Sequence, residues 1–328
     1  MNNFSQRRLQ PVLLALSLMA VCGSANAADN IVAEPAVVTI HANYLHSLFL
    51  MTDGSLWGAG SNLAGALGGG GFVRPTPWIV AKDVSAAAAG KLHSLFLKKD
   101  GSVWAVGWVG SGALADGFSI DLQKKPANLY DPEKGEGILR VTPIRVMEGA
   151  AAISAGTGHS LFLKHDGSVW ASGENEDGRL GDGTTSDKSR PVPIMKNVEA
   201  ISAGFGHSLF LKKDGSAWAT GRNDEGQLGD GTTTNRIRPV QVMTDVAAIS
   251  AGREHSLFLK KDGTVWASGK NEDGRLGDGT RMNQRKPVLV MTQVAAISAG
   301  DLHSLFSKND GSVWGTGSNR FGELGDAL

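Results

Sequence analysis

Residues 207–221 of this chain are HSLFLKKDGSAWATG, and this stretch decides the fold. Two short apolar runs, at 209–211 and 217–219, flank the pair Asp214-Gly215. An Asp-Gly pair between two such runs predicts a β-hairpin, because both turn residues must adopt positive φ. The hairpin pattern occurs six times, and the tripeptide His-Ser-Leu opens its copies at His46, His93, His159, His207, His255 and His303.

The spacing of these copies predicts the architecture. Successive histidines are 47, 66, 48, 48 and 48 residues apart. Each unit adds a run like VAAIS before the hairpin and a run like PVxVM after it, which gives four strands per unit. Four strands in about 40–50 residues is the pattern of a propeller blade. The sequence therefore predicts an all-β protein, a single β-propeller of six four-stranded blades.

The two ends of the chain complement each other. The last unit has no PVxVM run, and residues 31–33 (IVA) can supply that strand, after which residues 37–40 match the VAAI run. We therefore expect the N- and C-terminal strands to share one blade, which removes the free edges of the ring. The propeller domain is predicted to span residues 28–328.

Residues 1–27 have the features of a secretory signal peptide. Arg7 and Arg8 precede the apolar run 11–22, and Ala25-Asn26-Ala27 matches an A-x-A cleavage site. The apolar run is shorter than the roughly 20 residues that cross a bilayer, so no membrane span is expected in the mature chain. A buried N-terminal helix and lipid attachment at Cys22, the sole cysteine, are the alternatives. The expected location is the periplasm or the medium.

The charge balance argues against a nucleic-acid partner. The chain has 32 basic and 32 acidic residues, and the loss of Arg7 and Arg8 with the leader leaves 32 − 2 = 30 bases against 32 acids. A nucleic-acid-binding domain usually carries a clear basic excess.

The repeated motifs AGxxHSLFL, DGSVW, GxNxxGxLGDG and PVxV resemble the regulator of chromosome condensation repeat over nearly all of residues 30–328. The resemblance implies a β-propeller, usually of seven blades, so six blades is a departure. The family includes a nuclear exchange factor for a small GTPase, many eukaryotic protein-binding modules and a secreted bacterial propeller that inhibits β-lactamases. Because of the export signal, the secreted bacterial propellers are the family members whose location is most similar to the one expected for this chain. The fold alone does not give the function.

The residues that recur in every unit are predicted to be structural. Adjacent His and Ser on a strand point to opposite faces, so a His-Ser catalytic pair within one unit is excluded. The six recurring tryptophans are expected between blades. The segment 175–183 (NEDGRLGDG) lacks the acid at position 173 and the glutamate at position 184 that an EF-hand would need. No catalytic motif, metal site or cofactor site is predicted.

The two residues between AG and HS differ in every unit and should form a ring on one face of the propeller. Among them Tyr44, Phe205 and Arg253 are candidate partner-binding residues, because Tyr and Arg are enriched at binding hot spots and Phe adds apolar area. The alternative is an ordinary variable surface.

The second unit differs most from the others. It carries an insertion at about 118–142 that contains Tyr130, and Trp108 stands where other units have a polar residue. We take Trp108 and Tyr130 as further partner-binding candidates. The alternative is a solvated loop whose base Trp108 shields.

Together these features predict an exported, non-enzymatic, monomeric propeller that binds another protein, as an inhibitor or an interaction module. A first alternative is a guanine-nucleotide exchange factor that acts on a small GTPase after delivery to a host. A second is a propeller lyase or glycosidase, which would need a carboxylate or histidine cluster that the repeats do not single out.

Overall fold

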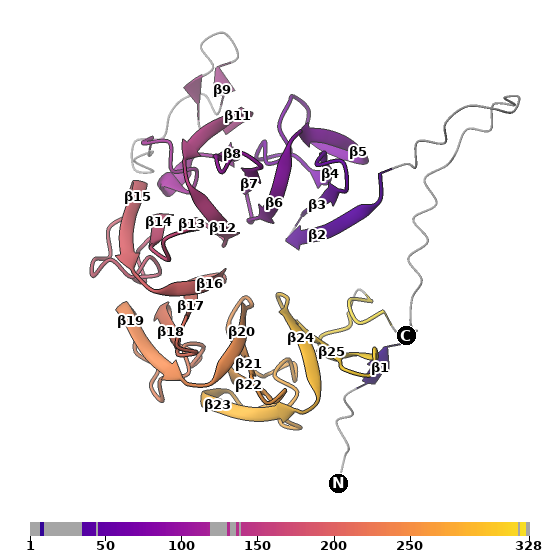
Figure 1. Cartoon of the computed structure of the whole chain (residues 1–328), viewed down its shortest axis with the longest axis vertical. Helices are drawn as coiled ribbons and strands as arrows, with labels where there is room; N and C mark the ends of the chain where they lie inside the picture. Colours follow the sequence, from indigo (N-terminus) through magenta and orange to yellow (C-terminus); the bar gives the residue numbers. More distant parts are fainter. Residues whose placement is uncertain are drawn as a thin grey trace, which may run out of the picture.

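A computed structural model describes residues 7–9, 35–43, 45–118, 130–131, 136–137, 139–320 and 322–325. Six four-stranded antiparallel sheets are arranged as blades around a common axis (Figure 1). The predicted all-β propeller of six blades is thus confirmed. Within these ranges the helical structure is limited to one 3-10 turn, Gly110–Gly112.

The first three blades follow the order of the repeats. Blade one contains β2 (Val37–Asn43), β3 (His46–Met51), β4 (Leu56–Ser61) and β5 (Val73–Ala81). Blade two contains β6 (Val84–Ala89), β7 (His93–Lys98), β8 (Val103–Trp108) and β11 (Leu139–Met147). Blade three contains β12 (Ala150–Ala155), β13 (His159–Lys164), β14 (Val169–Gly173) and β15 (Lys188–Met195). A separate pair, β9 (Tyr130–Asp131) and β10 (Glu136–Gly137), lies in the insertion of blade two.

The next three blades follow the same pattern. Blade four contains β16 (Val198–Ala203), β17 (His207–Lys212), β18 (Ala217–Gly221) and β19 (Arg236–Met243). Blade five contains β20 (Val246–Ala251), β21 (His255–Lys260), β22 (Val265–Gly269) and β23 (Gln284–Met291). Blade six contains β24 (Val294–Ala299), β25 (His303–Lys308), β26 (Val313–Gly317) and β1 (Arg7–Leu9). The first strand of each repeat lies nearest the axis (Figure 1).

The Asp-Gly turn inside each blade is fixed by a short chain of hydrogen bonds. In blade four Gly215 has a φ of +83°, but Asp214 does not have positive φ, so the prediction that both turn residues adopt positive φ was wrong for the aspartate. The Asp214 carboxylate accepts hydrogen bonds from the backbone N–H and the hydroxyl of Ser216, at 2.9 and 2.6 Å. The Ser216 Oγ in turn accepts one from Trp218 Nε1, at 2.9 Å. The turn thereby holds the tryptophan of the next strand in place.

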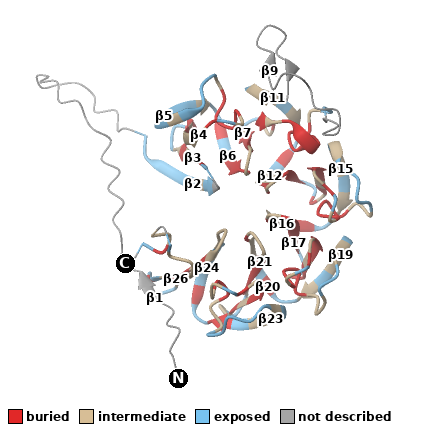
Figure 2. Cartoon of the chain, turned by 180° about the vertical axis from the view of Figure 1, so that it is seen from behind, coloured by how far each residue is buried: buried red, intermediate tan, exposed pale blue. Residues whose placement is uncertain are grey.

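Each blade has two unlike faces, and the core lies between consecutive blades. At the junction of blades four and five, Leu209 and Leu211 pack with the fully buried Phe258 and with Trp266. We call these the leucine face of one blade and the phenylalanine face of the next. Figure 2 shows the buried residues along these junctions, which confirms the predicted position of the tryptophans from blade two to blade six.

The recurring histidine also joins neighbouring blades. His207 Nε2 lies 2.9 Å from the hydroxyl oxygen of Ser256 in blade five, and four other junctions repeat the contact. Burial lowers the pKa of His207 to about 3, so the ring is neutral at pH 7. The predicted structural role is confirmed at these five junctions, and the partner is the serine of the following blade.

Both ends of the chain contribute a strand to blade six, but the N-terminal strand is Arg7–Leu9 and not the predicted residues 31–33. The strand that pairs with β26 is Arg7–Leu9, with Arg8 opposite Trp314. The prediction assigned this place to residues 31–33, which lie outside the described residues.

The junction between blade six and blade one differs from the other five. Inner strands of consecutive blades pack side by side around the ring, but β24 and β2 do not (Figure 1). Within the described ranges, His303 makes no hydrogen bond to Ser47, the residue that corresponds to Ser256. We call this junction the seam.

No helix among the described residues has the length and apolar character needed to cross a bilayer.

Candidate functional site

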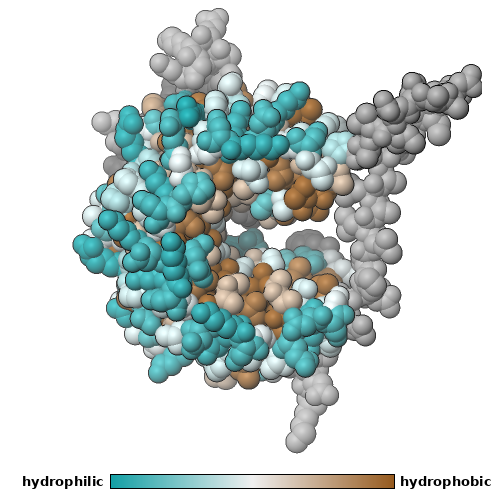
Figure 3. Space-filling view, viewed as in Figure 1, coloured by the Kyte–Doolittle hydropathy of each residue, from teal (hydrophilic) through white to brown (hydrophobic). Residues whose placement is uncertain are grey.

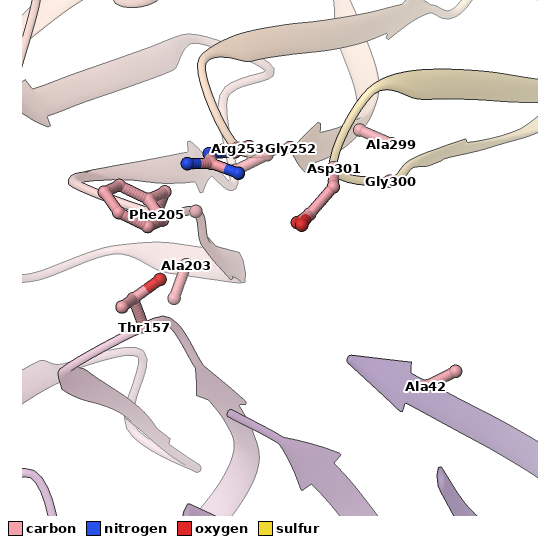
Figure 4. Close-up of a pocket in the computed structure, with 11 residues that line it drawn as sticks. Ala42, Thr157, Ala203, Phe205, Gly252, Arg253, Ala299, Gly300 and Asp301 are labelled. Atoms are coloured by element: carbon pink, nitrogen blue, oxygen red, sulfur yellow. The ribbon is translucent and has the colours of Figure 1, made fainter. Parts of the chain in front are cut away.

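The loops between the first and second strands of the blades surround the axis at one end of the ring. They line a cavity of about 100 Å³ together with small residues of the inner strands. Figure 4 shows Thr157, Phe205, Arg253 and Asp301 projecting at this cavity from blades three to six, with Ala42 of blade one across from them. We call this region the axial mouth. The variable residues of blades three to six therefore lie on one face around the axis, as predicted.

Backbone hydrogen bonds tie the loops of Lys91, Phe205 and Arg253 to the next blade. The Phe205 N–H donates to the Gly252 carbonyl, and the Arg253 N–H donates to the Gly300 carbonyl, both at 3.3 Å. Glycine is required at position 252 because a Cβ there would lie 2.3 Å from a ring carbon of His255. The structural histidines thus shape the loops that carry the variable side chains.

Phe205 of blade four is flanked by two cations, Arg253 of the neighbouring blade five and Lys91 of blade two. The Arg253 guanidinium lies 5.0 Å from the centre of the Phe205 ring, and the Lys91 ammonium lies 5.9 Å from it. Both distances fall in the range of cation–π attraction. Among the described residues the Arg253 guanidinium has no ion-pair or hydrogen-bond acceptor, so its donors remain available to a bound group.

Charged pairs surround the axial mouth on blades three to five. Lys270 lies 3.3 Å from Glu254 and 3.4 Å from Glu225 of the preceding blade. Arg179, itself almost fully buried, pairs with Glu174 and with Asp177. These pairs neutralise one another, whereas Arg253 has no ion-pair partner among the described residues.

Blade one presents apolar side chains at the same end of the ring. Leu45, Leu63 and Phe72 are exposed there. Leu63 occupies the position that Glu176, Asp224 and Glu272 occupy in blades three to five. Blade one is therefore more apolar at this end than blades three to five.

The structure brings only some of the predicted site residues together. Phe205 and Arg253 meet at the axial mouth, whereas Tyr44 lies outside the described residues. Trp108, at the end of β8, is half-buried, and its backbone N–H donates to the Leu92 carbonyl at 2.9 Å. Tyr130 belongs to β9, and its side chain is not described.

Sequence reasoning missed the roles of Lys91 and Asp301 in this arrangement. Both stand at the same repeat position as Phe205, so the alignment of the repeats contained the signal. Their contacts depend on side-chain directions that the alignment does not give.

The residues of the described ranges offer no group of three or more His, Cys, Asp or Glu that could hold a metal ion. Five of the six recurring histidines are engaged at the junctions between blades. The site as described is therefore suited to binding by contact.

Comparisons with known proteins identify the repeats. A family model described as RCC1-like domain matches residues 20–292, and a model of the regulator of chromosome condensation (RCC1) repeat matches residues 294–323. No curated protein matches the chain by sequence.

Two solved structures show how far the fold is shared. Human WBSCR16 superposes with a TM-score of 0.77 at 22% identity, over 89% of this chain and 79% of that one. Yeast RCC1 (Prp20), solved bound to Kap60, gives a TM-score of 0.72 at 21% identity, over 88% of this chain and 71% of that one. Identities this low show similarity of fold alone.

Proposed function

We propose, from the premise that this chain belongs to the family of RCC1-like domains, that it is a non-enzymatic protein-binding propeller whose axial mouth contacts the partner. The observation that carries the proposal is Phe205 between Lys91 and Arg253, with the guanidinium of Arg253 open to a bound group. Aromatic and arginine side chains in a well-packed setting are typical binding hot spots. The protein acts as a monomer in this proposal.

The chemistry of the mouth suggests what the partner presents. A guanidinium forms paired hydrogen bonds with a carboxylate, and its position over Phe205 fixes its direction. We therefore expect an acidic side chain of a partner loop at Arg253, with the stem of that side chain over the phenylalanine. Asp301 at the same cavity favours a neighbouring backbone N–H or a cation of the partner.

The rigidity of the loops supports this mode of binding. The loops of Lys91, Phe205 and Arg253 are each held by a backbone hydrogen bond to the next blade, so little conformational freedom is lost when a partner docks. The exposed apolar residues of blade one extend the contact area beyond the mouth.

We place the action of the protein outside the cytoplasm, in the periplasm or the medium. This part of the proposal rests on the leader features of residues 1–27. An extracytoplasmic binding propeller acts as an inhibitor or as an interaction module, depending on the protein that it captures.

The test is capture of a partner from envelope and medium fractions, followed by affinity measurement with variants. The double variant Phe205→Ala/Arg253→Ala should weaken binding at least about tenfold, because both hot-spot side chains are lost. Leu289→Ala, on the exposed outer strand β23, is the matched control and should leave binding unchanged. Tyr44→Ala tests the remaining predicted position. Unchanged affinity in the double variant at an unchanged melting temperature would remove the axial mouth from the proposal.

Guanine-nucleotide exchange is the second candidate. Its support is the insertion of blade two, which carries the added strands β9 and β10. One of the similar structures, Prp20p from Saccharomyces cerevisiae, is described with its binding properties to Gsp1p and histones. Purified protein that accelerates nucleotide release from a small GTPase, and loses this effect when residues 119–138 are replaced by a short linker, would favour this candidate.

A further inference from the structure

The seam exposes a phenylalanine face that every other junction buries. Val37 of β2 is 38% exposed, whereas its counterpart Val246 is fully buried. Ile40 is 51% exposed, and Phe49 is half-buried where Phe258 has no exposed surface. In Figure 2 the strand β2 is coloured as exposed along its length.

The opposite wall of the seam is the leucine face of blade six. Val313 is 39% exposed, whereas its counterpart Val265 is fully buried. Leu305 is half-buried, although Leu257 at the same repeat position is fully buried. The space-filling view shows hydrophobic surface on the described residues on both sides of the seam (Figure 3).

The polar contacts that accompany blade packing are missing at the seam as well. At the next junction along, the Ala299 N–H donates to the Ser250 hydroxyl at 2.9 Å, and His255 lies 3.0 Å from Ser304. Within the described residues neither contact has an equivalent between blade six and blade one. Both apolar packing and hydrogen bonding are therefore unfulfilled on the two walls.

The five formed junctions define what would complement each wall. A phenylalanine face accepts leucine and valine side chains, and a leucine face accepts phenylalanine, isoleucine and tryptophan. A single sheet with one face of each kind would complement both walls.

The wall on blade six also differs in sequence from a standard leucine face. Ser307 stands where blade five has Leu259, and Gly315 stands where it has Ala267. Direct closure of blade six on blade one would place the Ser307 hydroxyl against Phe49 and Ile40, which offer it no acceptor. A buried hydroxyl without a hydrogen bond is unfavourable. An external sheet can supply a polar group at this point.

We infer that the seam is a docking site for one β-sheet of a partner protein, which presents leucine or valine side chains to blade one and aromatic or isoleucine side chains, with one hydrogen-bonding group, to blade six. This surface is separate from the axial mouth, and the inference does not depend on the function proposed there.

The first test asks whether the ring has room for one more blade. A second copy of residues 246–293, one full 48-residue unit, is inserted after Gln293. We expect the seven-repeat protein to melt at least about 5 °C higher than the parent, because both walls of the seam become buried. A lower melting temperature would overturn the inference.

A single substitution separates an open seam from direct closure. Ser307→Leu restores the leucine of the other repeats, so it should raise the melting temperature of the seven-repeat protein, in which position 307 is buried. The same substitution should leave the six-repeat parent unchanged. Equal stabilisation of both proteins would show that six blades close on themselves and would overturn the inference.

The second test supplies the sheet in trans. The probe is a fluorescently labelled polypeptide of residues 246–293, and its binding to the full chain is followed by anisotropy. Phe49→Ser should weaken binding at least tenfold, whereas Ile237→Ser, an apolar-to-polar change at an exposed position on β19 outside the seam, should have no effect. The seven-repeat protein should not bind the probe. Absence of binding to the parent, or binding that the seven-repeat protein retains, would overturn the inference.

Discussion

His207 Nε2 lies 2.9 Å from Ser256 Oγ, so the histidine of blade four is hydrogen bonded to the serine of blade five. The serine hydroxyl also donates to the Gln227 carbonyl of blade four at 2.7 Å. His and Ser are adjacent in every repeat, yet they serve different junctions, because the histidine reaches the following blade and the serine the preceding one.

The inter-blade contact should contribute measurably to stability. Ser256→Ala leaves the buried His207 ring without its Nε2 partner, and we expect a loss of about 1–3 kcal/mol in the free energy of unfolding. Urea denaturation measures this loss. Ser47→Ala is the control, because the equivalent contact is not formed at the seam. Equal losses for the two variants would contradict the assignment.

The buried histidines should make the protein labile to acid. Burial lowers the pKa of His46 to about 4 and the pKa values of His93 and His207 to about 3. Histidine in the unfolded chain titrates near pH 6.5. Between pH 6.5 and the lowered pKa values, the unfolded chain therefore binds more protons than the folded chain. The contribution of these histidines to the free energy of unfolding is fully present above pH 6.5. It should decrease as the pH drops, by up to about 1.4 kcal/mol per pH unit for each histidine.

Thermal denaturation between pH 8 and pH 4 measures this dependence. His207→Gln removes one titrating group and should reduce the slope below pH 6.5. A melting temperature that stays constant from pH 7 to pH 4.5 would contradict the assignment of neutral, buried histidines.

Trp108 should make the loop that follows β8 intolerant of a side chain. A Cβ at Gly110 would lie 2.0 Å from a ring carbon of Trp108, whereas a Cβ at Gly70 would meet nothing within 4 Å. Gly110→Ala should therefore lower the melting temperature, while Gly70→Ala should leave it unchanged or slightly higher. In the Trp108→Ala background the cost of Gly110→Ala should disappear. Persistence of the cost there would show that another contact restricts Gly110.

The fourth strand of blade six should change when the leader is removed. In the full chain Arg7–Leu9 pairs with β26, and a chain that begins at residue 28 lacks this strand. The sequence predicts that residues 31–33 take its place. Val32→Pro should then destabilise the 28–328 chain, because proline cannot donate a ladder hydrogen bond, but it should not affect the full chain.

Melting temperatures of both chain lengths, with Val32→Thr as the control, test this prediction. An equal effect of proline in the two chains would contradict the exchange of strands.

The blades were predictable from the sequence because the signals that form them are local. Asp214, Gly215 and Trp218 act within one hairpin, and the repeat period places each hairpin in a blade. The sequence predicted that Phe205 and Arg253 lie on the same face of the propeller. It could not predict that their side chains stack, since stacking depends on the angle between blades.

The seam could not be predicted from the sequence, for a related reason. Repeat identity fixes which faces pack together, but the number of blades that completes a circle depends on small rotations at each junction. Ser307 and Gly315 were visible as departures from the repeat, yet without the open wall beside them they carried no structural meaning.

The five histidine–serine hydrogen bonds between blades run in one sense around the ring, because each histidine contacts the serine of the following blade. A ring built this way has a direction. Opening it at any junction exposes a leucine face on one side and a phenylalanine face on the other. Duplication or loss of one repeat unit therefore produces ends that still match every internal blade. Blade number can accordingly change in a single genetic event without any compensating substitution, which makes the count of blades the most readily altered property of this architecture.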